Sequence, residues 1–298
     1  MISVAELTKV FGSVKALDHI SFTVEPAEVV ALLGPNGAGK STALKAIVGL
    51  IRPTGGRVSV CGHDPWHKPV QARREVGYLP QRVAFPGTLS PRAVLAFYAG
   101  LRDLPTTRVQ EAVERTALSP WLDRAIGEFS GGMLQRLGLA VALLGNPRIL
   151  ILDEPSQSLD PDGQTRLKEL IKEWRAEGRT VLLSTHQIAE AEQLADRVGI
   201  LKDGRLATLE RVDRIMAGLP ARLRFKPDCM DRALAVLAEL TFVRTISSNG
   251  SLLISCPQEE RLPLLSRLSR AGIELQSFQT EEPSLEEILL HSLSGGDE

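Results

Sequence analysis

Residues 29–42 read VVALLGPNGAGKST, and this stretch decides the fold. Its first five residues are all apolar, which predicts a short strand that is buried on both faces. The pattern Gly34-x-x-x-x-Gly39-Lys40-Ser41 follows directly, and a helical run begins behind it. Strand, glycine-rich loop and helix in this order are the context of a phosphate-binding loop. A plain glycine turn would need neither the buried strand before it nor Lys-Ser behind it.

The residue types of this loop suit a polyphosphate. Glycines let backbone N–H groups turn inward around phosphate oxygens, and the helix N-terminus adds partial positive charge. Lys40 supplies a point charge for the β- and γ-phosphates, and the Ser41 hydroxyl can ligate magnesium. We therefore expect a nucleotide to contact the loop residues Gly34, Pro35, Asn36, Gly37, Ala38, Gly39, Lys40, Ser41 and Thr42.

A second buried strand is predicted at residues 148–155, RILILDEP, with Asp153 and Glu154 at its carboxyl end. Open α/β sheets bind ligands at that edge. Asp153 is suited to hold magnesium, directly or through water, and Glu154 is suited to orient or deprotonate an attacking water. A third apolar strand, TVLLSTH, is predicted to end in His186.

Composition sets limits on the class of protein. A length of 298 residues favours one large and one small domain. A net charge of −1 gives no reason to expect a nucleic-acid partner. No apolar run approaches the roughly 18 residues that cross a bilayer, and the N-terminus lacks the pattern of a secretion signal. The three cysteines are scattered, which suits a reducing compartment, so we expect a cytosolic protein.

Four further stretches carry weaker signals. Residues 76–81, VGYLPQ, predict a strand that ends at Gln81, and residues from about 88 to 145 have the composition of a helical insertion. Ser130-Gly131-Gly132 opens an apolar helix, where the serine can cap the helix and the glycines permit close approach of an anion. Taken alone, this Ser-Gly-Gly would be a plain helix start. Cys61, His63 and His67 have no fourth ligand at a suitable spacing, so we expect a solvated loop there rather than a zinc site.

With these motifs in place, the sequence resembles the ATP-binding subunits of ABC transporters over residues 1 to about 217. The phosphate loop, Gln81, the Ser-Gly-Gly stretch, the acidic strand end and His186 occur in the family's order. The resemblance implies an α/β fold, the ABC ATPase domain of P-loop NTPases with a helical subdomain at about 88–145. It also implies ATP and Mg²⁺ as cofactors.

The resemblance further implies roles for individual residues. Phe11 would stack on adenine, and Gln81 would sense magnesium and contact a membrane subunit. Ser130, Gly131 and Gly132 would bind the γ-phosphate of a nucleotide held by an opposing chain. Asp160 would lie in the loop that connects the two sites, and His186 would touch the γ-phosphate.

Two departures from the family pattern are visible. The signature reads FSGGM at residues 129–133 where relatives most often have Leu-Ser-Gly-Gly-Gln, and methionine at its end resembles the branch that serves drug, lipid and polysaccharide exporters. The loop before Asp160 reads SQSLD where relatives more often have a small residue and glycine, which puts the tuning of site-to-site coupling in question.

Residues 219–292 have a different pattern of predicted strands and helices from the rest of the chain. Their predicted order is βαββαβ, with Asn249-Gly250 as a hairpin turn, and this order indicates a small α+β domain of ferredoxin-like type. A last amphipathic helix is predicted from Pro283, and residues 293–298 are predicted to be disordered.

Together with the resemblance, these features predict an ATPase subunit that powers a separately encoded permease. The branch that the signature resembles implies an exporter. The subunit would lie on the inner face of the cell membrane. Its partners would be that permease and a second copy of itself or a homologous ATPase chain. Residues 78–94 and LPARLRF at 219–225 are also similar to the ATPase subunits that serve copper-site maturation of nitrous-oxide reductase. A soluble ABC-type ATPase of DNA repair or translation is disfavoured by the single motif set and the lack of a heptad run. A regulatory module without turnover is disfavoured by the intact Glu154 and His186.

Overall fold

The computed structural model describes residues 1–214, 220–248 and 251–281. The chain divides into two compact units, Met1–Glu210 and Arg211–Glu298. The sequence predicted the boundary at 217–219, a position outside the described ranges. The division instead falls at the end of the last strand of the first unit.

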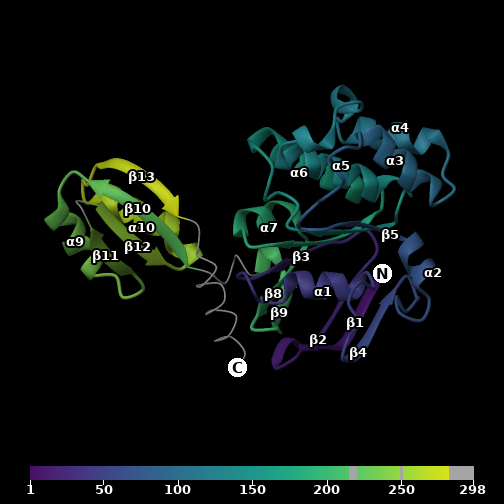
Figure 1. Cartoon of the computed structure of the whole chain (residues 1–298). Coiled ribbons are helices and arrows are strands. Elements are labelled where there is room, and N and C mark those ends of the chain that lie inside the picture. The colour runs from purple at the N-terminus through teal and green to yellow at the C-terminus, as the bar shows by residue number, and fades with distance from the viewer. Residues whose placement is uncertain (215–219, 249–250, 282–298) are drawn as a thin grey trace. The chain divides into compact units, whose positions relative to one another are not determined.

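A six-stranded sheet forms the centre of the first unit (Figure 1). Its strand order is β5-β6-β7-β3-β8-β9. The strands are β3 (Val29–Leu33), β5 (Val76–Leu79), β6 (Ile149–Asp153), β7 (Thr180–Thr185), β8 (Arg197–Lys202) and β9 (Arg205–Arg211). The pairs from β5 to β8 are parallel. Every residue of β3, β6 and β7 is buried, as expected for central strands of a sheet that is covered on both faces. The carboxyl ends of the predicted buried strands therefore meet at one edge.

Helix α1 (Lys40–Ile47) lies between this sheet and a smaller one. It contacts β6 and β7 on one side and β2 and β4 on the other. The smaller sheet is antiparallel, with the order β2-β1-β4, and its strands are β1 (Ile2–Phe11), β2 (Val14–Val24) and β4 (Gly55–Val60). A continuous hydrophobic core includes residues of both sheets and of α1, among them Ile2, Leu32, Leu44 and Ile151. Packing on two sides fixes the start of α1, which is where the phosphate loop ends.

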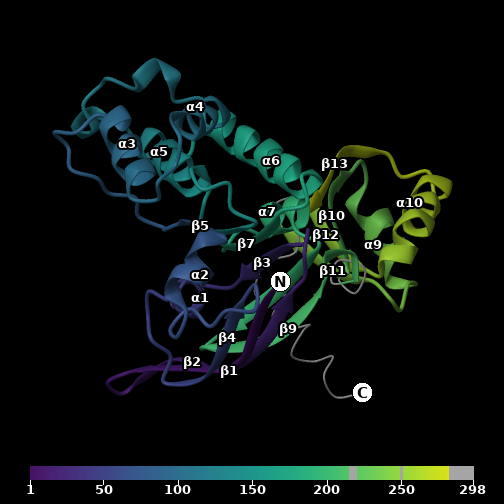
Figure 2. The same cartoon turned by 90° about the vertical axis from the view of Figure 1, so that its right-hand side faces the viewer.

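The predicted helical insertion forms a cluster at the end of the first unit away from the smaller sheet (Figures 1 and 2). Its members are α3 (Pro91–Gly100), α4 (Thr106–Arg115) and α5 (Gly131–Leu143), and α5 also packs on β5. The remaining α-helices of this unit are α2 (Pro69–Arg74), α6 (Pro161–Ala176) and α7 (Ile188–Leu194), and two short 3-10 helices lie at Ser119–Trp121 and Ile126–Glu128. Helices α1 and α7 lie on opposite faces of the large sheet.

The second unit has the predicted βαββαβ order. Its elements are β10 (Ala221–Pro227), α9 (Met230–Ala238), β11 (Arg244–Ser248), β12 (Ser251–Cys256), α10 (Arg261–Arg270) and β13 (Leu275–Glu281). The sheet is antiparallel, with the order β11-β12-β10-β13, which is the order of a ferredoxin-like fold. As far as the described ranges go, its core is built from residues of this unit, such as Phe225, Leu237, Ile254 and Leu264.

Three predictions lie outside the described residues: the turn at Asn249-Gly250, the last helix from Pro283 and the tail at 293–298. Strands β11 and β12 nevertheless pair antiparallel up to Ser248 and Ser251, on either side of the predicted turn. Among the described helices, none has both the length and the apolar character that a bilayer crossing requires.

Candidate active site

The glycine-rich loop joins β3 to α1, and two of its glycines are required by close packing. A Cβ atom on Gly34 would lie 2.3 Å from the carbonyl oxygen of Leu201, and one on Gly39 would lie 2.6 Å from that of Ala16. Gly39 also has a φ of +104°, a left-handed conformation that is strained for any side chain. The loop is thus packed tightly against β2 and β8, which limits how far its backbone can move.

Lys40 is held inside the curve of the loop. Its ammonium group donates hydrogen bonds to the carbonyl oxygens of Gly34 at 2.7 Å and Pro35 at 3.2 Å. It also lies 3.6 Å from Glu154 Oε1, and both side chains are at most 5% exposed. Burial lowers the pKa of the Lys40 ammonium, while the Glu154 carboxylate acts in the opposite direction. The cation is therefore poorly solvated and favoured to pair with incoming anionic oxygens.

Asp153 ends β6 and is fully buried. Its Oδ1 atom accepts hydrogen bonds from Ser41 Oγ at 2.9 Å and from Ser184 Oγ at 2.7 Å. Within the described part of the chain, the other carboxylate oxygen, Oδ2, has no hydrogen-bond partner although it is buried. A carboxylate and a hydroxyl are the hard oxygen ligands that Mg²⁺ prefers. Ser41 and Asp153 therefore fit a magnesium ion, which would give the unsatisfied oxygen a partner.

Glu154 is held in an unusual backbone conformation at the sheet edge. It is buried and has a φ of +47°, in the left-handed region that non-glycine residues seldom occupy. Its N–H group donates to the side-chain oxygen of Ser184 at 3.0 Å, which fixes this turn. Its Oε2 atom lies 3.2 Å from His186 Nδ1. The carboxylate is thus held between Lys40 on one side and His186 on the other.

A pocket of about 250 Å³ lies over the loop and brings part of the predicted site together. It is lined by Ala16, Asn36, Gly37, Ala38, Gly39, Lys40, Ser41, Thr42, Gln81 and Glu154. Gln81 reaches it from the chain just after β5, and its amide group donates to Gln157 Oε1 at 3.4 Å. Loop, glutamine and acidic strand end therefore surround one space, although they are far apart in the sequence.

Several predicted site residues do not line this pocket. Phe11 is 47% exposed at the end of β1, and the Lys9 ammonium lies 4.6 Å from its ring centre, a cation–π contact. Ser130 caps α5 by accepting a hydrogen bond from the Met133 N–H. Asp160 caps α6 by accepting one from the Gly163 N–H. Both caps satisfy the free N–H groups of a helix start, which is the ordinary role of Ser and Asp there.

The Ser-Gly-Gly stretch faces the segment that follows β6. A Cβ atom on Gly131 would lie 3.3 Å from the side chain of Ser158, and one on Gly132 would lie 3.3 Å from its carbonyl oxygen. The stretch is therefore packed against residues 158–159 of its own chain rather than over its own phosphate loop.

Two contributors to the site were missed by sequence reasoning. Ser184 bonds both Asp153 and Glu154, and it lies directly opposite Asp153 in the parallel pairing of β6 and β7. Buried Gln135 on α5 donates to the carbonyl oxygen of Pro155 at 3.0 Å. The only sequence signal was a serine at the end of an otherwise apolar strand and a glutamine on an apolar helix.

This geometry defines a class of protein. A phosphate-binding loop, an oxygen pair suited to Mg²⁺ and a buried carboxylate beside them are the parts that nucleoside-triphosphate hydrolysis requires. The fold and the site are those of a P-loop nucleoside triphosphatase.

Comparison with known proteins narrows the class. Residues 17–157 match the family model described as "ABC transporter". The chain is 34% identical to a daunorubicin resistance ATP-binding protein, DrrA3, from Streptomyces coeruleorubidus, over 99% of this chain and 96% of the relative. It is 30% identical to the bacitracin transport ATP-binding protein BcrA from Bacillus licheniformis, over 99% of this chain and 98% of the relative.

Solved structures agree with these relatives. An ATP-binding subunit of an ABC transporter superposes with a TM-score of 0.67 and 32% identity, over 72% of this chain and 91% of that chain. A dimeric post-hydrolysis state of the MJ0796 cassette, bound to ADP and phosphate, superposes with a TM-score of 0.64 and 27% identity. The match covers 71% of this chain and 99% of that chain. This chain belongs to the family of ABC transporter ATP-binding subunits, and it is an ATPase.

Proposed function

We propose that this chain hydrolyses ATP to power export through a separately encoded membrane permease. The observation that carries the hydrolytic part is the Glu154 carboxylate, which is fixed at the sheet edge between Lys40 and His186. A carboxylate at this position can accept a proton from a water that attacks the γ-phosphorus. His186 steadies that carboxylate, and its ring is 40% exposed. We expect this exposed ring to touch the γ-phosphate.

The other residues bind and orient the nucleotide. The loop N–H groups and Lys40 hold the β- and γ-phosphates, and Phe11 stacks on adenine outside the pocket described above. Ser41 and Asp153, with Gln81 near them, would hold Mg²⁺. When bound, this ion neutralises part of the phosphate charge. Ser184 keeps Asp153 and Glu154 in place through its two hydrogen bonds.

The active unit is proposed to be a dimer. Ser130, Gly131 and Gly132 present a helix start that can bind an anion, yet they pack on Ser158 and do not line their own loop's pocket. A second chain that faces the first would place this stretch on the partner's γ-phosphate, with Asp160 near the junction of the two sites. The dimeric solved relatives support this arrangement.

The permease is proposed to dock at a second cavity of the first unit, of about 500 Å³. This cavity lies beside the chain between β5 and α3 and is walled by apolar and aromatic side chains, including Tyr78, Val83, Phe85 and Tyr98. Arg82 and Arg102 also line it, so an amphipathic permease segment with acidic residues would complement it in shape and charge. Docking here would place the whole chain at the inner face of the membrane.

Export of an antibiotic-like molecule is the substrate class that the relatives support best. Relatives named for daunorubicin and bacitracin are similar over nearly the whole chain, tail included. Copper-site maturation of nitrous-oxide reductase rests on the likeness of residues 78–94 and 219–225 alone, so we rank it second. The second unit contributes contact with its counterpart or with a regulator rather than chemistry.

Co-purification tests the assignment. The tagged chain is purified from detergent-solubilised membranes of its own cell, and the retained membrane proteins are identified by mass spectrometry. Ala84→Arg fills the exposed part of the docking cavity, and Ala176→Arg at the exposed end of α6 is the matched control away from it. We expect one permease with the wild type and the control, and loss of it with Ala84→Arg while ATP binding persists. The proposal would be contradicted if the wild-type chain retained no membrane protein and its ATPase rate were the same with and without membranes.

A further inference from the structure

The turn between β8 and β9 is tied to the back of the phosphate loop. The Gly204 N–H donates to the carbonyl oxygen of Ala38 at 3.1 Å. The Gly204 carbonyl oxygen in turn accepts a hydrogen bond from the Asp18 N–H at 2.8 Å. Gly204 therefore links the loop to β2 through two backbone hydrogen bonds.

The packing around this link leaves almost no free space. A Cβ atom on Gly204, whose φ is +77°, would lie 2.9 Å from the carbonyl oxygen of Ala16. Ala16 is also the residue that excludes a side chain at Gly39, and both Ala16 and Ala38 line the nucleotide pocket. A shift of the β8–β9 turn would therefore move the wall of the pocket.

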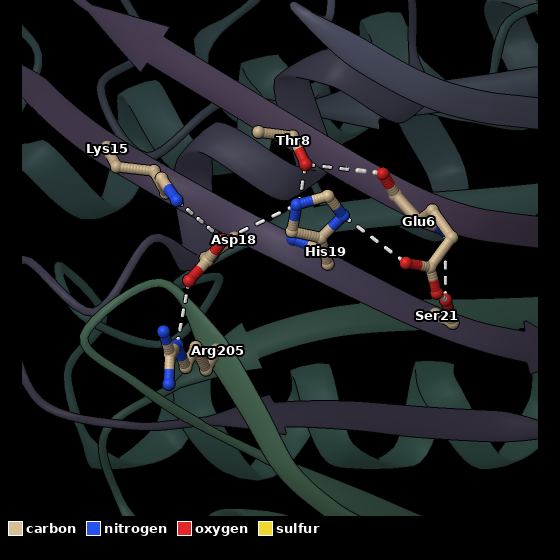
Figure 3. A network of polar contacts seen from close by, with 7 residues as sticks. All are labelled: Glu6, Thr8, Lys15, Asp18, His19, Ser21 and Arg205. Carbon is tan, nitrogen blue, oxygen red and sulfur yellow. Dashed lines mark hydrogen bonds and ion pairs between the residues drawn. The ribbon is translucent and has the colours of Figure 1, made fainter.

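One side chain holds this turn from the outside. Arg205, the first residue of β9, donates through Nε to Asp18 Oδ2 at 2.8 Å (Figure 3). Lys15 approaches the same carboxylate from another side, with its Nζ atom 3.0 Å from Oδ1. These hydrogen bonds, from Lys15 and then Arg205, lower the pKa of the Asp18 carboxyl. The side chain of Asp18 is about 10% exposed and that of Arg205 is 74% exposed. The carboxylate is therefore largely buried, and the arginine contacts it from the solvent side.

We propose that Asp18 and Arg205 are positioning residues for the phosphate loop: their ion pair holds the Gly204 turn against Ala38 and so presets the loop for the polyphosphate. The proposal rests on the function proposed above, because it assumes that this loop binds ATP. Neither residue is among those that line the nucleotide pocket. Their effect comes from preorganisation, since a loop that is already shaped loses less conformational freedom on binding.

The test compares ATP affinity with the stability of the nucleotide-free protein. Arg205→Gln, Asp18→Asn and the double variant are measured by equilibrium binding of a fluorescent ATP analogue with Mg²⁺ and by thermal melting without nucleotide. Arg92→Gln is the matched control, because Arg92 makes a two-bond ion pair with Asp123 on the exposed surface of the helical cluster.

We expect each single variant to raise the Kd for the analogue about three- to fivefold, the upper range for an exposed ion pair. The double variant should bind no more weakly than the weaker single variant, because both remove the same interaction. Arg205→Lys should restore most of the affinity, and the difference between wild type and Arg205→Gln should shrink in 1 M salt. The melting temperature of the nucleotide-free Arg205→Gln protein should match that of the Arg92→Gln protein.

A folded Arg205→Gln protein with wild-type affinity would overturn the proposal. So would an equal loss of affinity in Arg92→Gln. Should Asp18→Asn fail to fold, Arg205→Gln decides, since its side chain is mostly in solvent. Failure of the proposed function is distinguishable, because the wild type would then bind the analogue no better than a Lys40→Ala protein.

Discussion

The ammonium group of Lys40 lies 3.6 Å from a carboxylate oxygen of Glu154, and both side chains are almost completely buried. One residue begins α1 and the other follows β6, so the contact joins the phosphate loop to the acidic strand end. The Glu154 carboxylate compensates the buried Lys40 charge, and Glu154 itself has a second contact in His186, whose Nδ1 atom lies 3.2 Å from Oε2. The γ-phosphate of ATP would enter this space and compete with Glu154 for the lysine.

Replacing Lys40 by alanine should abolish tight nucleotide binding. The change removes a charge-assisted contact to the β- and γ-phosphates, worth about 2–3 kcal/mol, so the Kd for ATP should rise about 30- to 150-fold. Lys45→Ala, in the last turn of the same helix, is the control for the loss of a lysine from α1. Equilibrium binding of a labelled ATP analogue measures both, and an unchanged Kd in Lys40→Ala would contradict the assignment of the loop.

Ser184→Ala should loosen the site without touching the nucleotide. The variant leaves Asp153 with one hydrogen-bond partner fewer and removes the side-chain bond to the Glu154 N–H. Loss of such buried bonds costs about 1–3 kcal/mol in free energy of unfolding, which chemical denaturation measures. Its ATPase rate should also fall, whereas Ser59→Ala on β4 should leave both stability and rate unchanged. A fully stable and active Ser184→Ala protein would show that this serine does not support the two carboxylates.

The proposed dimer, in which two chains face each other across the bound nucleotides, predicts nucleotide-dependent association. With ATP and Mg²⁺, a Glu154→Gln protein should form dimers at tens of micromolar concentration, because the Ser-Gly-Gly stretch of each chain would complete the other's site. ADP lacks the γ-phosphate and should leave the protein monomeric. Light scattering distinguishes the two states. A monomer under both conditions would contradict a homodimer and point to a different ATPase chain as the partner.

The second unit should be dispensable for nucleotide binding. Among the described residues, the core of the first unit extends no further than Leu209, and that of the second begins at Ala221. Units with separate cores fold separately, so a chain that ends near residue 217 should remain folded. It should also gain stability from ATP, about 2.7 kcal/mol at a nucleotide concentration 100 times the Kd. Thermal melts of the full and shortened chains with and without ATP measure this, and an insoluble or ATP-insensitive short chain would argue against modularity.

The parts of this protein that could be predicted from sequence are those with a local signal. The apolar run before Gly34 and the run before Asp153 each specify a buried strand, and the order of the motifs specified the family fold. The tail's alternation of strands and helices likewise specified its ferredoxin-like order, which the sheet confirms.

The contacts between distant segments could not be predicted in this way. Ser184 becomes a partner of Asp153 only through the register of β6 and β7, and the sequence of either strand alone does not fix that register. The link from Asp18 to Gly204 depends on two chain segments that meet behind the loop. A lone aromatic such as Phe11 carries no information on where a base would lie, so its role in adenine binding stays a prediction.

Single-turnover hydrolysis of radiolabelled ATP tests the central claim most directly. The claim is that the Glu154 carboxylate, held between Lys40 and His186, activates the attacking water. Glu154→Gln should bind ATP at least as tightly as the wild type, because it removes a negative charge beside the phosphates, and should hydrolyse it about 10²- to 10⁴-fold more slowly. Exposed Glu192→Gln on α7 should hydrolyse it at the wild-type rate. Near-normal single-turnover hydrolysis by Glu154→Gln would contradict this account of the site.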